Sequence, residues 1–127
     1  MAARILVVDD DLDTVNLLRL VLQRAGYKVI TASSLEEVID RVKLAEQYHE
    51  YIDLVILDLI MPGRSGYQCM ERLIEINPEA RIIVASGYME MEGWGSELLS
   101  QARFIVRKPY EMRDLLQLIR KALDETG

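Results

Sequence analysis

Residues 5–11 read ILVVDDD, four apolar residues followed directly by three aspartates. A continuous, mostly β-branched apolar run is typical of a strand that is covered on both faces, as in a parallel sheet. Similar runs occupy residues 54–57 and 82–85, and shorter ones occupy residues 29–30 and 104–106. We therefore expect five strands, the first of which ends where the aspartates begin.

Stretches with helical periodicity lie between these runs. Val15, Leu18 and Leu22 recur at helical spacing, and Gly26 stands where that helix is expected to end. The sequence SLEE at residues 34–37 has the spacing of a capping box. It predicts the start of a second helix.

The second half of the chain continues the alternation. Periodic apolar residues run up to the Asn-Pro pair at residues 77–78, which ends a third helix, and a last helix covers residues 115–123. The fourth unit is weaker, because three glycines interrupt residues 87–95. We expect a loop there and then a short helix at residues 96–101. Alternating strands and helices predict one α/β domain over residues 1–127, with an open sheet and right-handed crossovers.

Composition excludes several classes of protein. The 127 residues carry 15 basic and 21 acidic side chains, a formal charge of −6, which disfavours non-specific binding to nucleic acid. No apolar run approaches the length of a membrane span, so we expect no membrane contact. Cys69 is the only cysteine, so no internal disulfide forms and a reducing, cytoplasmic location is expected. We also expect neither a targeting segment nor a DNA-binding output domain.

Charged and hydroxyl side chains follow four of the predicted strands. Asp9 and Asp10 follow the first, Asp58 the third, Ser86 the fourth and Lys108 the fifth. In an open parallel sheet, ligands bind beyond the carboxyl ends of the strands. Clustered carboxylates suit Mg²⁺, which prefers oxygen ligands, and an aspartate can itself accept a phosphoryl group. The pattern predicts a site for phosphoryl transfer, with a lysine to offset charge.

The motifs at these strand ends resemble those of one family. They are residues 5–11, 57–63 (LDLIMPG), 84–87 (VASG) and 107–110 (RKPY). In this order they are similar to the receiver domain of response regulators, the phosphoacceptor domain of two-component signalling, over essentially the whole chain. The resemblance implies a flavodoxin-like fold with strand order 2-1-3-4-5. It also implies a signalling switch that catalyses only its own phosphorylation and dephosphorylation.

The resemblance assigns a role to each candidate residue. It implies that Asp58 is the phosphoacceptor, Ser86 the switch hydroxyl and Lys108 the charge partner. It further implies a Mg²⁺ site whose ligands are Asp9, Asp10, Asp58 and the backbone carbonyl of Ile60. The peptide bond between Lys108 and Pro109 is expected to be cis. The expected partner is a histidine kinase or a histidine phosphotransfer protein. The face of the fourth helix, fifth strand and fifth helix is expected to contact partners, either by docking an acidic partner or by homodimerisation.

The sequence departs from the family pattern in several places, two of which bear on the site and the fold. The family's switch aromatic lies three residues before the lysine, where this chain has Ile105, with Phe104 one residue earlier. Which of the two replaces the aromatic is left open. Residues 44–52 add length, as a longer second helix or a longer loop.

Two alternatives remain at this stage. Asp11 and Asp13 match the Asp-x-Asp nucleophile motif of haloacid-dehalogenase-like phosphohydrolases. However, an aspartate just after a strand is more often a helix N-cap, which is our interpretation of Asp11. The second alternative is an unphosphorylated pseudo-receiver that serves only as an interaction module.

Overall fold

The structure is a computed structural model that describes residues 2–61, 65–87 and 94–124. Within these ranges it contains five strands: β1 (Arg4–Val8), β2 (Lys28–Ala32), β3 (Leu54–Leu57), β4 (Ile82–Ser86) and β5 (Phe104–Arg107). They form one parallel sheet in the order β2-β1-β3-β4-β5. The expected fold and strand order are confirmed.

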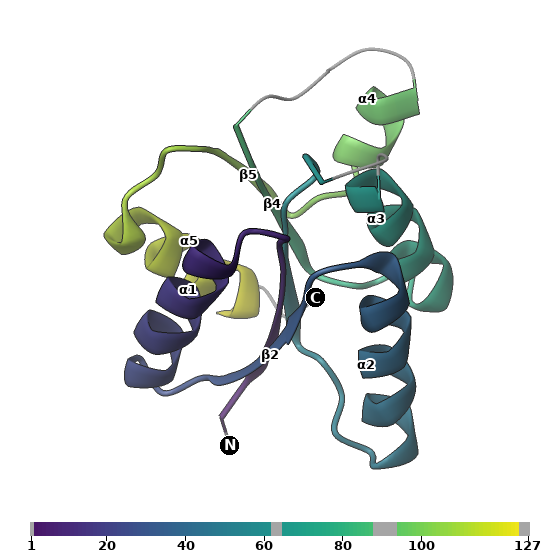
Figure 1. The fold of residues 1–127 in the computed structure, drawn as a ribbon, viewed down its shortest axis with the longest axis horizontal. Coiled ribbons are helices and arrows are strands. Elements are labelled where there is room, and N and C mark those ends of the chain that lie inside the picture. Colours follow the sequence, from purple (N-terminus) through teal and green to yellow (C-terminus); the bar gives the residue numbers. More distant parts are fainter. Residues whose placement is uncertain (1, 62–64, 88–93, 125–127) are drawn as a thin grey trace.

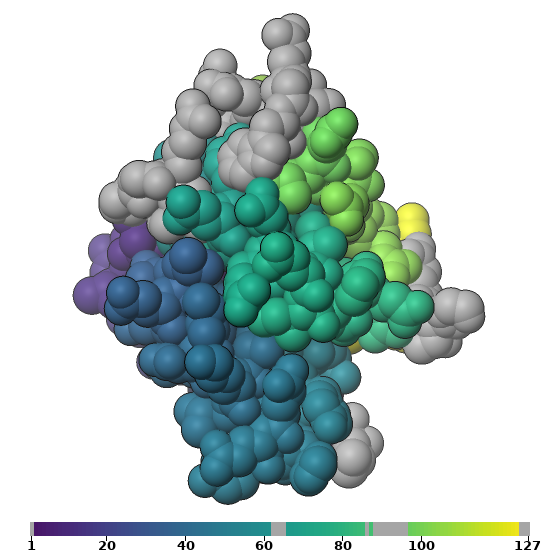
Figure 2. Space-filling view, turned by 90° about the vertical axis from the view of Figure 1, so that its right-hand side faces the viewer, coloured from purple at the N-terminus to yellow at the C-terminus, as the bar shows by residue number. Residues whose placement is uncertain are grey.

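Helices cover both faces of the sheet (Figure 1). The described helices are α1 (Leu12–Arg24), α2 (Leu35–Gln47), α3 (Ser65–Ile76), α4 (Trp94–Leu99) and α5 (Met112–Asp124). α1 and α5 pack on one face, whereas α2, α3 and α4 pack on the other (Figure 1). Figure 2 looks onto this second face, where α2 and α3 lie side by side.

Two apolar cores result, one on each face of the sheet. Strand β1 shows why, because alternate side chains of a strand point to opposite faces. Leu6 and Val8 contribute to the core beneath α2, α3 and α4, and Ile5 and Val7 contribute to the core beneath α1 and α5. All four side chains are fully buried. This double coverage explains why the strands are continuous apolar runs.

Helices α1 and α2 begin with the caps that the sequence predicts. The Asp11 carboxylate caps α1 by accepting a hydrogen bond from the amide of Asp13. The Ser34 hydroxyl caps α2 by accepting from the amide of Glu37 at 3.2 Å. The Glu37 carboxylate reaches back to the amide of Ser33 at 2.7 Å. The capping box is therefore present, although its returning hydrogen bond goes to the residue before the cap.

The extra length at residues 44–52 forms an extended end of α2 and the connection to β3. His49 follows the helix with φ of 55°, in the left-handed region. The amide of His49 donates to the carbonyl of Glu46 at 3.3 Å, and the amide of Glu50 donates to the carbonyl of Ala45 at 2.9 Å. These two bonds define a Schellman motif, which satisfies carbonyls that the end of a helix leaves free.

The fourth unit follows the prediction in outline. A short helix is present, but α4 spans Trp94–Leu99 and so begins two residues before the predicted start. The predicted loop at residues 88–93 lies outside the described residues. Among the helices in the described ranges, none has the length and apolar character needed to cross a bilayer.

Candidate functional site

The ends of β1, β3 and β5 bring three charged residues to one edge of the sheet. Asp9 directly follows β1, Asp58 directly follows β3 and Lys108 directly follows β5. The ladder of backbone hydrogen bonds continues into the site, because the amide of Asp58 donates to the carbonyl of Val8 at 2.9 Å. The amide of Asp9 similarly donates to the carbonyl of Ala32 at 3.1 Å. The sheet itself therefore holds the backbone of both aspartates.

Three carboxylates form a compact cluster. Asp9, Asp10 and Asp58 each offer one oxygen atom, and these atoms all lie within 4.8 Å of one another. Asp9 and Asp58 are only 3% and 7% exposed, whereas Asp10 is exposed to solvent. Buried carboxylates need partners, because removing an unpaired charge from water is strongly unfavourable. The cluster thus requires a cation.

Lys108 supplies part of that positive charge. Its Nζ atom lies 2.9 Å from Oδ2 of Asp9 and 3.3 Å from Oδ2 of Asp58. The remaining oxygens accept backbone hydrogen bonds: Oδ1 of Asp9 accepts from the amide of Asp11, and Oδ1 of Asp58 accepts from the amide of Ile60, both at 2.9 Å. The peptide bond that follows Lys108 is cis, as expected.

Burial and charge perturb the acid–base behaviour of the site. Burial raises the pKa of Asp58, and the neighbouring Asp9 carboxylate adds to this effect, although the Ile60 amide and Lys108 oppose it. Burial tends to lower the pKa of Lys108, but the Asp9 and Asp58 carboxylates outweigh it and raise that pKa. Lysine thus stays charged between the two acids, and Asp58 holds its proton more readily than an exposed aspartate.

The donor set fits a hard divalent cation. Mg²⁺ is bound through oxygen atoms, commonly those of one or two carboxylates together with water and phosphate. The cluster of Asp9, Asp10 and Asp58 offers oxygens from three side chains within a small volume. Such a cation would complement the negative charge that Lys108 offsets only in part.

Asp11 and Asp13 do not join this cluster. Both oxygens of Asp11 are engaged at the start of α1, one by the amide of Asp13 at 3.3 Å and the other by the hydroxyl of Thr14 at 2.6 Å. This confirms Asp11 as an N-cap. A nucleophilic role for Asp11 has no support from the geometry.

The remaining candidates occupy the expected elements. Ile60 follows Asp58 by two residues, and its side chain is 49% exposed beside the site. Ser86 is the last residue of β4 and pairs with Arg107 of β5, and the role of its hydroxyl remains a prediction. Ile105 on β5 is 40% exposed, whereas Phe104 is half-buried and packs against the core beneath α1 and α5. Ile105 is therefore the more exposed of the two residues considered for the switch position.

Gly66 is a feature that sequence reasoning missed. It lies in the first turn of α3, against the backbone of the turn that follows β3. The only signal in the sequence is a glycine ahead of the third predicted helix, and the residues before a helix are of many types. Tyr110 was likewise assigned no role, although burial raises the pKa of its hydroxyl close to the charges of the site.

These features together define the class of the protein. The chain matches the response regulator receiver domain family over residues 5–120. It therefore belongs to this family of two-component signalling switches, and the phosphohydrolase and pseudo-receiver alternatives are not favoured.

Individual relatives agree with this assignment. The uncharacterized transcriptional regulatory protein YbdJ of Bacillus subtilis is 31% identical over 121 residues, which cover 95% of this chain and 51% of YbdJ. The chain thus spans about half the length of this relative. A CheY-like receiver domain from Methanospirillum hungatei has a TM-score of 0.82 and 31% identity, with coverage of 98% of this chain and 96% of the other. The response regulator TrrA from Thermotoga maritima, solved in complex with Mg²⁺-BeF, has a TM-score of 0.76 and 32% identity, with coverage of 95% and 99%.

Proposed function

We propose that Asp58 accepts a phosphoryl group from a phosphohistidine on a histidine kinase or a histidine phosphotransfer protein. In this transfer the bond between phosphorus and the imidazole nitrogen breaks, and a bond between phosphorus and a carboxylate oxygen of Asp58 forms. The released imidazole takes up a proton. The main support is the meeting of three carboxylates and one lysine at the ends of three strands.

The residues of the site would have separate roles in this transfer. Asp9, Asp10, Asp58 and the carbonyl of Ile60 would hold Mg²⁺, which when bound would offset charge on the phosphoryl oxygens. Lys108 lies between Asp9 and Asp58, where its ammonium can form an ion pair with the oxygens of the incoming phosphoryl group. The Ser86 hydroxyl would donate a hydrogen bond to the phosphoryl group once it is attached. The structure of the similar response regulator TrrA in complex with Mg²⁺-BeF supports the proposal that Mg²⁺ binds here.

The output surface is proposed to be the face of α4, β5 and α5. It carries the exposed Ile105 on the edge strand and a group of basic residues, Arg103, Arg107, Arg113, Arg120 and Lys121. Arg113 already pairs with the exposed Glu111 and Asp114 of its own chain. In a two-fold dimer such pairs could form between chains instead. Light scattering before and after phosphorylation tests the dimer, and an unchanged mass would contradict it.

Mass spectrometry tests the acceptor directly. The protein is incubated with Mg²⁺ and acetyl phosphate, and its intact mass is measured beside that of Asp58→Asn. Asp53→Asn is the matched control, because Asp53 precedes the same strand at its opposite end and accepts a hydrogen bond from the amide of Arg4. We expect a phosphate adduct on the wild type and Asp53→Asn, none on Asp58→Asn, and none with a chelator. A normal adduct on Asp58→Asn would refute the proposal.

A further inference from the structure

Gly66 makes an unusually close approach to the turn that carries the acceptor. A Cβ atom at Gly66 would lie 2.3 Å from the carbonyl oxygen of Leu59, 2.5 Å from the Cα atom of Leu59 and 2.6 Å from the carbonyl oxygen of Asp58. All three are backbone atoms, so no side-chain rotation relieves the contact. The φ angle of Gly66 lies outside the left-handed region, so glycine is required here by space and not by backbone conformation.

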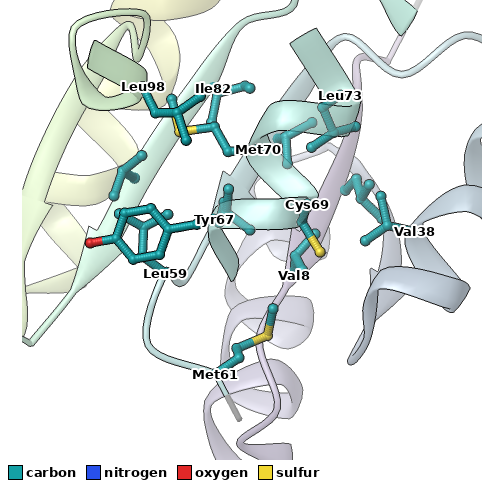
Figure 3. Packing of buried hydrophobic residues seen from close by; sticks show 14 of the residues in the cluster. Val8, Val38, Leu59, Met61, Tyr67, Cys69, Met70, Leu73, Ile82 and Leu98 are labelled. Carbon is teal, nitrogen blue, oxygen red and sulfur yellow. The ribbon is translucent and has the colours of Figure 1, made fainter. Parts of the chain in front are cut away.

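The turn has little freedom to move away from Gly66. The amide of Ile60 donates to Oδ1 of Asp58, and the amide of Met61 donates to the carbonyl of Leu59 at 3.1 Å. The side chains of Leu59 and Met61 are buried in the core beneath α2, α3 and α4 (Figure 3). Restoring ordinary van der Waals separation to an added methyl group would require about 1 Å of movement. The movement would displace the stretch of backbone that carries the Asp58 side chain and leads to the Ile60 carbonyl.

We propose that Gly66 is a positioning residue. It lets the start of α3 pack directly against the backbone of Asp58 and Leu59, and this contact holds the Asp58 carboxylate and the Ile60 carbonyl where both can bind one Mg²⁺ ion. This inference rests on the proposed function, which makes these two groups ligands of one cation. Because they are two residues apart, the turn alone decides how they lie relative to each other. A displaced turn changes both ligands together.

The size of the cation provides a specific signature. Mg²⁺ requires near-ideal octahedral geometry at about 2.0–2.1 Å, whereas Ca²⁺ accepts irregular arrangements at about 2.3–2.6 Å. A loosened or shifted turn therefore penalises Mg²⁺ more than Ca²⁺. Loss of fold stability alone would lower the affinities for both cations equally, or would change neither affinity.

Calorimetric titration of Gly66→Ala with Mg²⁺ and with Ca²⁺ tests this signature. We expect Mg²⁺ affinity to fall on the order of 10-fold, as is typical when a group that orients a ligand is disturbed, with a smaller change for Ca²⁺. Leu73→Ala is the control, because Leu73 is a buried residue of the same helix whose truncation weakens α3 packing away from the turn. It should retain the wild-type ratio of Mg²⁺ to Ca²⁺ affinity.

The outcomes separate this inference from the function on which it rests. A folded Gly66→Ala with the wild-type affinity ratio would overturn the positioning role and leave the proposed function standing. A wild type that neither binds Mg²⁺ nor takes up phosphate would overturn both. If Gly66→Ala does not fold, adding Met61→Ala opens space behind the turn, and this double variant is compared with Met61→Ala alone. A lowered affinity ratio then supports the role, whereas an unchanged ratio or a double variant that still does not fold overturns it.

Discussion

The Nζ atom of Lys108 lies 3.3 Å from Oδ2 of Asp58, although the two residues are 50 positions apart in the chain. The same ammonium lies 2.9 Å from Oδ2 of Asp9. One half-buried cation thus serves two carboxylates that are almost completely buried. We therefore expect this sharing to contribute to the stability of the metal-free protein.

Replacing Lys108 by methionine should destabilise the metal-free protein. The change leaves two buried carboxylates without their cation. We expect a loss of about 2–3 kcal/mol, below the 3–5 kcal/mol typical of a fully buried pair, because the Lys108 side chain is 27% exposed. Urea unfolding in the presence of a chelator measures the loss. Lys43→Met, at an exposed position of α2, is the control, and equal stability of the two variants would contradict the expectation.

Replacing Asp58 by asparagine should have the opposite effect at neutral pH. Folding raises the pKa of Asp58 above its ordinary value of 3.8, mainly through burial. Its contribution to stability is therefore fully present below pH 3.8 and is lost as the pH rises through the folded-state pKa. Asparagine does not ionise, so Asp58→Asn should have a higher melting temperature than the wild type at pH 7, and this difference should disappear in acid. A difference in melting temperature that grew as the pH fell would contradict this prediction.

Two variants of Asp11 test whether this residue is a helix N-cap or a nucleophile. Asp11→Ala removes the acceptor for the amide of Asp13, so α1 loses its cap and the melting temperature should fall. Asp11→Asn keeps an acceptor oxygen and should melt close to the wild type. Both variants should still take up phosphate from acetyl phosphate. Loss of phosphate uptake in both would instead favour the phosphohydrolase interpretation.

His49 should be replaceable by glycine with a gain in stability. Its φ of 55° places a residue with a Cβ atom in the left-handed region, which is unfavourable by roughly 1 kcal/mol. His49→Gly removes that strain and keeps both backbone bonds of the Schellman motif. The variant also loses an exposed contact with Tyr51, which offsets little of the gain. Thermal unfolding measures the change. Tyr48→Gly, one residue earlier with φ of −100°, should not show the gain.

Much of the fold follows from local patterns in the sequence. Residues 54–57 were predicted as a strand and form β3 with the same bounds, because an apolar run buried on both faces has clear limits. The cap at Ser34 was equally predictable, since hydroxyl side chains satisfy free amides at helix starts. The start of α4 was predicted two residues late, because glycines obscure helical periodicity and tertiary packing decides where so short a helix begins.

The candidate site shows the limit of such local patterns. The order of motifs indicates that Asp9, Asp58 and Lys108 meet, because parallel strands end at one edge of a sheet. It does not indicate that Lys108 bridges both acids, which depends on contacts across 99 and 50 residues. Nor does it reveal why Gly66 is needed, because the atoms that would clash with a side chain belong to another segment.

The sequence by itself determined the alternation of strands and helices, the residue types at the strand ends and therefore the receiver class. These properties depend on periodicity and on neighbours within a few residues. Only the tertiary structure decided that Oδ2 of both Asp9 and Asp58 faces Lys108, and that α3 packs directly against the backbone of the acceptor turn. The physical reason is that each of these facts is a distance of a few ångströms set by the packing of the whole sheet.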